Sequence, residues 1–169
     1  MIYNKEQIDL YLKKMEYNDE IKIDYETLCK LQIAHLTHIP YENIDVLNRK
    51  PISLESQDLF DKMIVKQRGG YCFELNGLYS NLLKSLGFNV TNLAGRFIYQ
   101  DGNTRMRLHR ILKIDIDDKS YISDVGVLSE LSRKSLELEA GKVQNDGKCD
   151  YKFQYNPKQE GEYILYQRK

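Results

Sequence analysis

The chain has 169 residues, of which 41% are hydrophobic and 30% are charged, and this composition suits a globular fold of one domain or of two small domains that share a core. Its 25 lysines and arginines balance its 25 aspartates and glutamates, which argues against a nucleic-acid partner because phosphate binding needs a basic excess or a basic face. There is no basic start followed by an apolar run and no apolar stretch of about 18 residues, so we expect no signal peptide, no membrane partner and a cytoplasmic location.

Two amphipathic helices are predicted at the start of the chain, over residues 4–16 and 24–35. In both, apolar residues recur every three or four positions, as one buried helical face requires. Each begins at a residue type that caps helices well, Asn4 in the first and Asp24 in the second. Residues 40–48 begin with a proline, which favours a loop or a short extended segment.

Two further helices are predicted downstream of that loop. One runs from residue 53 or 54 to residue 65, and the other covers residues 70–86. Gly87 directly follows the second of these helices and is a plausible stop signal, because glycine readily adopts the conformation that ends a helix.

After residue 87 the pattern changes to alternation with β-branched residues, which is typical of strands. Turn signals at residues 101–103 and 117–119 separate some of these runs. Strands are expected over residues 88–93, 96–99, 108–116, 120–125, 136–139, 151–155 and 163–166. The sequence thus predicts an α+β fold, with an N-terminal helical bundle packed on an antiparallel sheet or partial barrel. We divide it into a helical domain, residues 1–87, and a β-barrel-like domain, residues 88–169.

The three cysteines, Cys29, Cys72 and Cys149, have no CxxC spacing, and their odd number favours reduced thiols over a disulfide framework. No tight cluster of cysteines and histidines is present, so we expect no metal.

Cys72 is the candidate nucleophile because it falls in the first turn of the predicted helix over residues 70–86. Backbone N–H groups are free there, and the helix macrodipole stabilises a negative charge such as a thiolate. Gly69 and Gly70 just before it suggest that backbone or ligand passes close by. The alternative is a buried cysteine that packs as a small hydrophobic residue.

A thiol nucleophile needs a base, and the base needs an orienting group. His109 lies on a predicted strand and shares a face with Ile111, so it is a candidate base or, alternatively, a semi-buried histidine without a role. Asp124 closes the next predicted strand just before Gly126, and it is a candidate orienting group or an ordinary turn residue.

Residues 68–78, Arg-Gly-Gly-Tyr-Cys-Phe-Glu-Leu-Asn-Gly-Leu, resemble the active-site cysteine motif of the arylamine N-acetyltransferases. The resemblance extends upstream through residues 38–45 and downstream to residues 108–110 and 123–126, and it weakens after them. It implies a cysteine-proteinase-like arrangement in which Cys72 is the nucleophile, His109 the base, and Asp124 the acceptor that orients His109.

The reaction that the resemblance implies has two steps, with acetyl-CoA as the cosubstrate. Cys72 attacks the thioester and becomes acetylated, and CoA leaves. A small aromatic amine, hydrazine or hydroxylamine then takes the acetyl group. Backbone N–H groups near the start of the Cys72 helix are the natural donors for the oxyanions.

The resemblance also suggests supporting residues. Arg68 and Glu42 are expected to pair and, with Gly69 and Gly70, to support the site. The candidate substrate-binding residues are Tyr41, Tyr71 and Val127. Tyr41 stands where the family usually has phenylalanine, with core packing as its alternative, and Val127 also stands where the family has an aromatic residue.

The family members carry a third, C-terminal α/β domain, and this chain resembles a short form without it. We therefore expect an open cleft, with a homo-oligomer as one way to complete it. Two other functions remain open: a cysteine-dependent acyl hydrolase or acyltransferase that uses another donor, and a catalytically silent binding module that keeps the motif for structural reasons.

Overall fold

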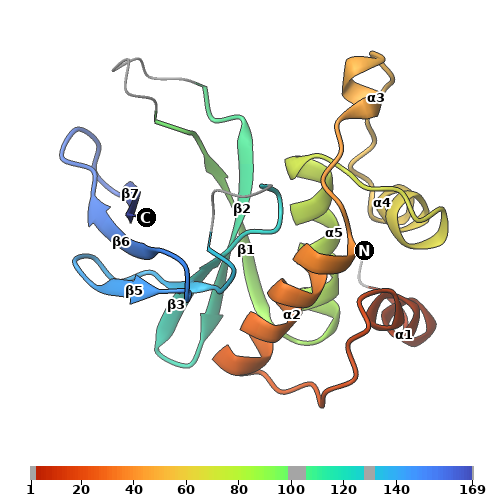
Figure 1. Ribbon diagram of the computed structural model, residues 1–169, viewed down its shortest axis with the longest axis horizontal. Coiled ribbons are helices and arrows are strands. Elements are labelled where there is room, and N and C mark those ends of the chain that lie inside the picture. Colours follow the sequence, from red (N-terminus) through yellow and green to blue (C-terminus); the bar gives the residue numbers. More distant parts are fainter. Residues whose placement is uncertain (1–2, 99–105, 128–131, 169) are drawn as a thin grey trace.

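The computed structural model describes residues 3–98, 106–127 and 132–168. Helices fill its first half and antiparallel strands its second, which confirms the predicted α+β class (Figure 1). The helical elements are α1 (Lys5–Lys14), α2 (Tyr25–His38), α3 (Ile44–Leu47), α4 (Ser56–Phe60), the π-helix η1 (Asp61–Val65) and α5 (Cys72–Ser85). The strands are β1 (Asn89–Gly95), β2 (His109–Ile116), β3 (Lys119–Ser123), β4 (Leu136–Glu137), β5 (Val143–Asn145), β6 (Asp150–Tyr155) and β7 (Tyr163–Arg168). None of the helices in these ranges is both long and apolar enough to cross a membrane.

The predicted starts of the first two helices are confirmed by their caps, whereas the next two predicted helices start at Ser56 and Cys72, two or three residues later than expected. Asn4 Oδ1 accepts a hydrogen bond from the Gln7 N–H at 2.9 Å, and Gln7 Oε1 accepts one from the Asn4 N–H at 3.1 Å. Asp24 Oδ1 accepts from the Thr27 N–H at 2.8 Å. The predicted stop signal at Gly87 is also present. This glycine follows the C-terminal end of α5 and has φ +100°, a conformation that favours glycine.

Three helical predictions need correction. Helix α2 continues beyond the predicted end at residue 35 to His38, and it stops only when Ile39, the residue before Pro40, turns extended. The predicted loop over residues 40–48 contains the short helix α3. The helix predicted to end at residue 65 begins as α4 but widens into the π-helix η1, a bulge that apolar periodicity does not reveal.

The strand predictions need smaller corrections. Residues 96–98 form no strand. Arg96 pairs with Glu162, and Phe97 packs on the His109 ring with 5.4 Å between centroids. Tyr99 and the predicted turn at residues 101–103 lie outside the described residues. Strand β3 ends at Ser123 instead of residue 125, and β5 is a short strand that the sequence did not indicate.

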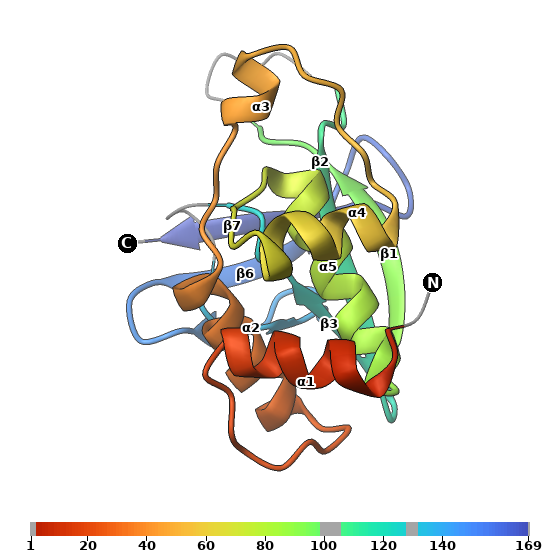
Figure 2. The same ribbon diagram turned by 90° about the vertical axis from the view of Figure 1, so that its right-hand side faces the viewer.

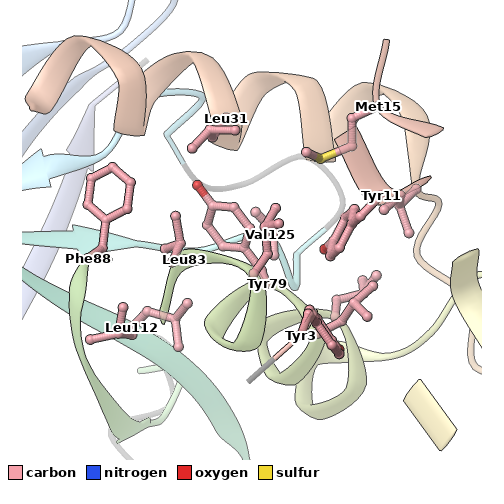
Figure 3. Close-up of a cluster of buried hydrophobic side chains, with 14 of the residues drawn as sticks. Tyr3, Tyr11, Met15, Leu31, Tyr79, Leu83, Phe88, Leu112 and Val125 are labelled. Atoms are coloured by element: carbon pink, nitrogen blue, oxygen red, sulfur yellow. The ribbon is translucent and has the colours of Figure 1, made fainter. Parts of the chain in front are cut away.

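The strands form two antiparallel sheets, one in the order β1-β2-β3-β4 and one in the order β5-β6-β7. Helix α5 lies between the first sheet and the other helices (Figures 1 and 2). One buried apolar cluster runs from α1 and α2 through α5 into β2, where it includes Leu112 and Ile114. Tyr79 of α5 sits inside this cluster beside Leu31 of α2 (Figure 3). The division into two domains at residue 87 stays a prediction, and this cluster includes residues on both sides of that boundary.

His35 is the unexpected member of the helical core, with no exposed surface at all. Its ring lies between those of Tyr11 and Tyr79, at centroid distances of 6.0 and 5.2 Å. Neither ring nitrogen has a hydrogen-bond partner among the described residues. Burial therefore disfavours the charged ring and lowers the pKa of His35 to about 3.

We expect the buried His35 to make folding sensitive to mild acid. Below its ordinary pKa near 6.5, the unfolded chain binds a proton at this position while the folded chain does not. The free energy of unfolding should therefore fall with pH by about 1.4 kcal/mol per unit between roughly pH 6.5 and pH 3. Urea unfolding at pH 7 and pH 5 measures this loss.

A His35→Leu variant should lose much less stability between these two pH values than the unchanged protein. His38→Gln is the matched control, because His38 lies on the same helix but is half-exposed, and it should keep the full loss. Equal losses in the His35→Leu variant and the unchanged protein would contradict the assignment.

Candidate active site

Cys72 lies in the first turn of α5, as predicted, but the helix begins at Cys72 itself and not at residue 70. Tyr71 before it is extended, with φ −89° and ψ 179°, and its N–H donates to Glu74 Oε2 at 3.1 Å. The N–H groups of Glu74 and Leu75 both donate to the Tyr71 carbonyl. The N–H groups of Cys72 and Phe73 have no such partner within the described ranges, so they are free to meet a negative charge.

The two glycines before Cys72 allow another segment of backbone to pass close by. A Cβ at Gly69 would lie 2.2 Å from the Pro40 carbonyl oxygen, and one at Gly70 would lie 2.9 Å from Glu74 Cβ. The Glu42 N–H donates to the Gly70 carbonyl at 2.9 Å, so the loop after α2 is hydrogen-bonded to the loop before Cys72, which we call the cysteine loop (residues 68–71). Of the two predicted reasons for the glycines, backbone or ligand, the structure provides the first.

The predicted pairing of Arg68 with Glu42 is present. Arg68 Nε donates to Glu42 Oε1 at 2.8 Å, and Arg68 Nη2 also reaches Asp45 Oδ2 at 3.2 Å. This pair holds the cysteine loop to the segment that begins α3. The starts of α3, α5 and β2 consequently gather at one end of the molecule (Figures 1 and 2).

His109 is the first residue of β2 and lies beside Cys72, with only 6% of its surface exposed. Its Nε2 lies 2.5 Å from Asp124 Oδ2, which leaves Nδ1 for the thiol. Burial disfavours the charged ring, but hydrogen bonds to Asp124 and Cys72 and the negative charge of both outweigh burial and raise the pKa of His109 to about 9. The ring therefore favours its charged form at neutral pH. Cys72 Sγ also lies 3.7 Å from the Leu108 carbonyl oxygen.

Asp124 is the first residue after β3 and is buried. Its Oδ1 accepts from the Gly126 N–H and from Asn76 Nδ2, both at 2.8 Å, while Oδ2 faces His109. These bonds explain why the strand ends early, because the backbone after Ser123 bonds to side chains instead of a neighbouring strand. The carboxylate is thus fixed in one orientation.

Asn76 is a site residue to which the sequence reading assigned no role. It has no exposed surface, and its amide bonds to three groups: Asp124 Oδ1, the Arg110 carbonyl at 2.6 Å and the Val125 N–H at 3.1 Å. It lies four residues after Cys72, hence one helical turn away on the same face. A polar residue at that spacing inside an apolar helix was the available signal.

Gly126 brings the segment after β3 directly against the nucleophile. A Cβ at this position would lie 2.6 Å from Asn76 Nδ2 and 2.8 Å from Cys72 Cα. No side chain fits there, so glycine is the residue that lets the Asp124 segment close on the start of α5.

The candidate substrate-binding residues are all half-buried. Tyr41 packs partly against the main core, and Tyr71 lies 5.7 Å from the Phe73 ring. Tyr41 forms a backbone bridge with Gly70 and Tyr71 directly precedes Cys72, so both tyrosines lie near the cysteine. Burial and then the charge of Cys72 raise the pKa of both tyrosines. Val127 directly follows Gly126. Whether these three residues bind substrate stays a prediction.

The arrangement is suited to covalent catalysis by a thiolate. The Cys72 thiol, the His109 ring and the Asp124 carboxylate lie side by side, each in contact with the next. The ring favours its charged form at neutral pH, and the carboxylate fixes its orientation. Two free N–H groups beside the thiol can stabilise an oxyanion. No group of three or more histidine, cysteine, aspartate or glutamate side chains placed to hold a metal ion occurs in the described part of the chain.

The amino-acid sequence is similar to those of known N-acetyltransferases. The sequence matches the N-acetyltransferase family model over residues 24–169. The arylamine N-acetyltransferase / N-hydroxyarylamine O-acetyltransferase of Salmonella typhimurium is 40% identical over 129 residues, which are 76% of this chain and 46% of that protein. The chain thus spans about half the length of the curated relatives it matches.

The solved structures agree with the sequence comparison. An arylamine N-acetyltransferase structure from Salmonella typhimurium superposes with a TM-score of 0.90 at 33% identity, covering 99% of this chain and 60% of that one. The Mycobacterium marinum arylamine N-acetyltransferase solved in complex with CoA gives a TM-score of 0.86 at 30% identity, covering 95% of this chain and 60% of that one.

We predict that Asn76→Ala uncouples the nucleophile helix from Asp124. The change leaves the buried Val125 N–H without its acceptor and removes the donor that Asn76 supplies to Asp124 Oδ1 and to the Arg110 carbonyl, which should lower the free energy of unfolding by about 2–4 kcal/mol. It should also slow iodoacetamide alkylation of Cys72 at pH 7 by at least about tenfold, since His109 loses its fixed partner. Mass spectrometry of the alkylated protein measures the rate.

Asn81→Ala is the matched control, because Asn81 lies on the same helix and donates to Ser56 Oγ at 2.8 Å, away from Cys72. It should lower stability less and leave the alkylation rate unchanged. An Asn76→Ala protein that alkylates at the original rate would refute the role given to this amide.

Proposed function

The chain belongs to the N-acetyltransferase family, and on that premise we propose that it transfers an acetyl group from acetyl-CoA through a cysteine thioester to an arylamine, arylhydrazine or arylhydroxylamine. In this proposal Cys72 is the nucleophile, His109 exchanges the protons, and Asp124 holds the His109 ring. The relatives' names support the acceptor class, and the CoA complex of the Mycobacterium marinum protein supports the donor.

The first step acylates Cys72. Its thiolate attacks the carbonyl carbon of acetyl-CoA, a new C–S bond forms, and the C–S bond to CoA breaks. The leaving CoA thiolate takes a proton from the His109 imidazolium, so His109 becomes neutral. The charged ring at neutral pH, which the raised pKa of His109 indicates, is the form that this step requires.

The second step releases the acetyl group to the acceptor. A weakly basic aryl nitrogen is unprotonated at neutral pH and attacks the Cys72 thioester directly. Its proton passes to the neutral His109 as the C–S bond to Cys72 breaks, which restores the thiolate and imidazolium. Because an amide is more stable than a thioester, this second step drives the overall reaction toward the product.

Each step passes through a tetrahedral oxyanion beside Cys72. The free N–H groups of Cys72 and Phe73 lie at the positive end of the α5 dipole, and they are the donors that we assign to it.

One observation carries the proposal: the thiol of Cys72, the ring of His109 and the carboxylate of Asp124 form one connected line of contacts although they come from three separate segments. A cysteine kept only for packing needs neither a charged histidine nor a carboxylate bonded to that histidine on its far side.

The direct test is the intact mass of the protein after mixing with acetyl-CoA in the absence of an acceptor. We expect one acetyl group on the unchanged protein and none on Cys72→Ala. Cys149→Ala is the matched control, because Cys149 is buried away from the site, and it should still be acetylated. Aniline-type and hydrazine acceptors should then remove the acetyl group.

Loss of the adduct to water alone, with no arylamine product, would replace transfer by thioester hydrolysis. No adduct and no CoA release in the unchanged protein would contradict acetyl-CoA as the donor.

A further inference from the structure

The first turn of α5 contains a buried negative charge that the proposed reaction does not use. Glu74 lies two residues after Cys72, and its side chain is only 3% exposed. One carboxylate oxygen accepts from the Tyr71 N–H at 3.1 Å, which caps the helix. The other lies 2.7 Å from Lys62 Nζ, on the π-helix η1.

Lys62 is itself mostly buried, with 18% of its side chain exposed, and it bridges two carboxylates. Its Nζ lies 2.9 Å from Asp45 Oδ2 in α3, in addition to its contact with Glu74. Arg68 reaches the same oxygen of Asp45 at 3.2 Å. Hydrogen bonds from Lys62, ahead of those from Arg68, lower the pKa of Asp45 to about 2. The charges Glu42, Arg68, Asp45, Lys62 and Glu74 thus form one alternating row, which we call the ionic chain.

The end of the ionic chain at Glu74 matters for the nucleophile. A carboxylate in the first turn favours the helix, but it repels a second negative charge in the same turn. Both the Cys72 thiolate and the oxyanions of the proposed reaction would bring such a charge. Because Glu74 is buried, water screens this repulsion poorly, and a cation held against Glu74 has to offset it.

We propose that Lys62 is a positioning residue for the Cys72 nucleophile, because its ammonium group neutralises Glu74 and so keeps the first turn of α5 able to hold the thiolate and the oxyanion. The proposal rests on the role given to Cys72 under the proposed function. It concerns the reactivity of the thiol, which can be measured without acetyl-CoA.

The π-helix gives this contact its geometry. Widening the turn over Asp61–Val65 places Lys62 between Asp45 and Glu74, while Met63 and Ile64 remain buried in the core. The Met63 sulfur would lie 3.0 Å from a Cβ at Gly70, so η1 packs directly against the cysteine loop. Lys62 is consequently held in place from both sides.

The remaining charged or titratable groups around this turn are unchanged in the variants below. Arg110 of β2 has its Nη1 3.5 Å from the Phe73 carbonyl oxygen. The others that face the turn or the thiol are Glu42, Asp45 and Arg68 of the ionic chain, with Tyr41, Tyr71, His109 and Asp124.

The test follows iodoacetamide alkylation of Cys72 from pH 5 to pH 10 by mass spectrometry. The alkylation rate should rise with pH as the thiol ionises, and the midpoint is the pH at which the rate is half its maximum. In Lys62→Met, the uncompensated carboxylate of Glu74 should shift this midpoint upward by about one pH unit and slow alkylation at neutral pH by about tenfold. Lys62→Arg keeps the charge and should stay close to the original profile.

Glu74→Gln supplies the opposite shift and does not depend on the folding of Lys62→Met. Glutamine at this position can still cap the helix, so removal of the negative charge alone should move the midpoint downward. The double variant Lys62→Met/Glu74→Gln should return close to the original profile. A structural role of Lys62 alone would change thermal stability but would not produce opposite shifts that cancel.

Lys50→Met is the matched control. Lys50 also approaches Asp45, with Nζ 3.5 Å from Oδ1, but its side chain is 62% exposed and it makes no contact with Glu74. This variant should keep the original profile. The proposal is overturned if Lys62→Met leaves the midpoint unchanged, or if Glu74→Gln fails to relieve its shift.

The result of this alkylation test can be distinguished from the result of the acetylation test of the proposed function. An unchanged protein that alkylates at Cys72 but accepts no acetyl group from acetyl-CoA would refute the donor, and the opposite shifts of Lys62→Met and Glu74→Gln would still support the role of Lys62.

Discussion

The side-chain amide of Asn76 is the contact on which the candidate site depends. Cys72 comes from the helical half of the chain, and His109 and Asp124 come from the strands, so their alignment requires a rigid connection between the halves. Asn76 supplies it from the turn after Cys72, by bonding to Asp124 and to the backbone on either side of the site. Its full burial means that water cannot replace these bonds.

Close backbone packing supports the same alignment. Gly126 lets the Asp124 segment touch Cys72, and Gly69 lets the loop after α2 touch the cysteine loop. Both contacts leave no space for a side chain, so small shifts in either segment would move the thiol relative to His109. The site is therefore fixed by packing around the start of α5, and the charged groups act on a geometry that is already set.

Local signals predicted part of this structure well. The cap at Asn4, the place of Cys72 in the first turn of a helix and the pairing of Arg68 with Glu42 follow from short-range patterns or from a long motif. The burial of His35 and the contact between Lys62 and Glu74 depend on elements far apart in the sequence, and no local pattern indicates them. The π-helix escaped prediction because its apolar residues look like those of an ordinary helix.

Asp124 and Cys72 together hold the His109 ring charged at neutral pH. Nuclear magnetic resonance titration can follow the charge of the His109 ring, since the chain has only 3 histidines and the buried His35 should stay neutral. We expect the His109 ring to titrate with a pKa of about 9 in the unchanged protein, and with a much lower pKa in Asp124→Asn. A His109 ring that titrates near 6.5 in the unchanged protein would mean that Asp124 and Cys72 do not hold it charged.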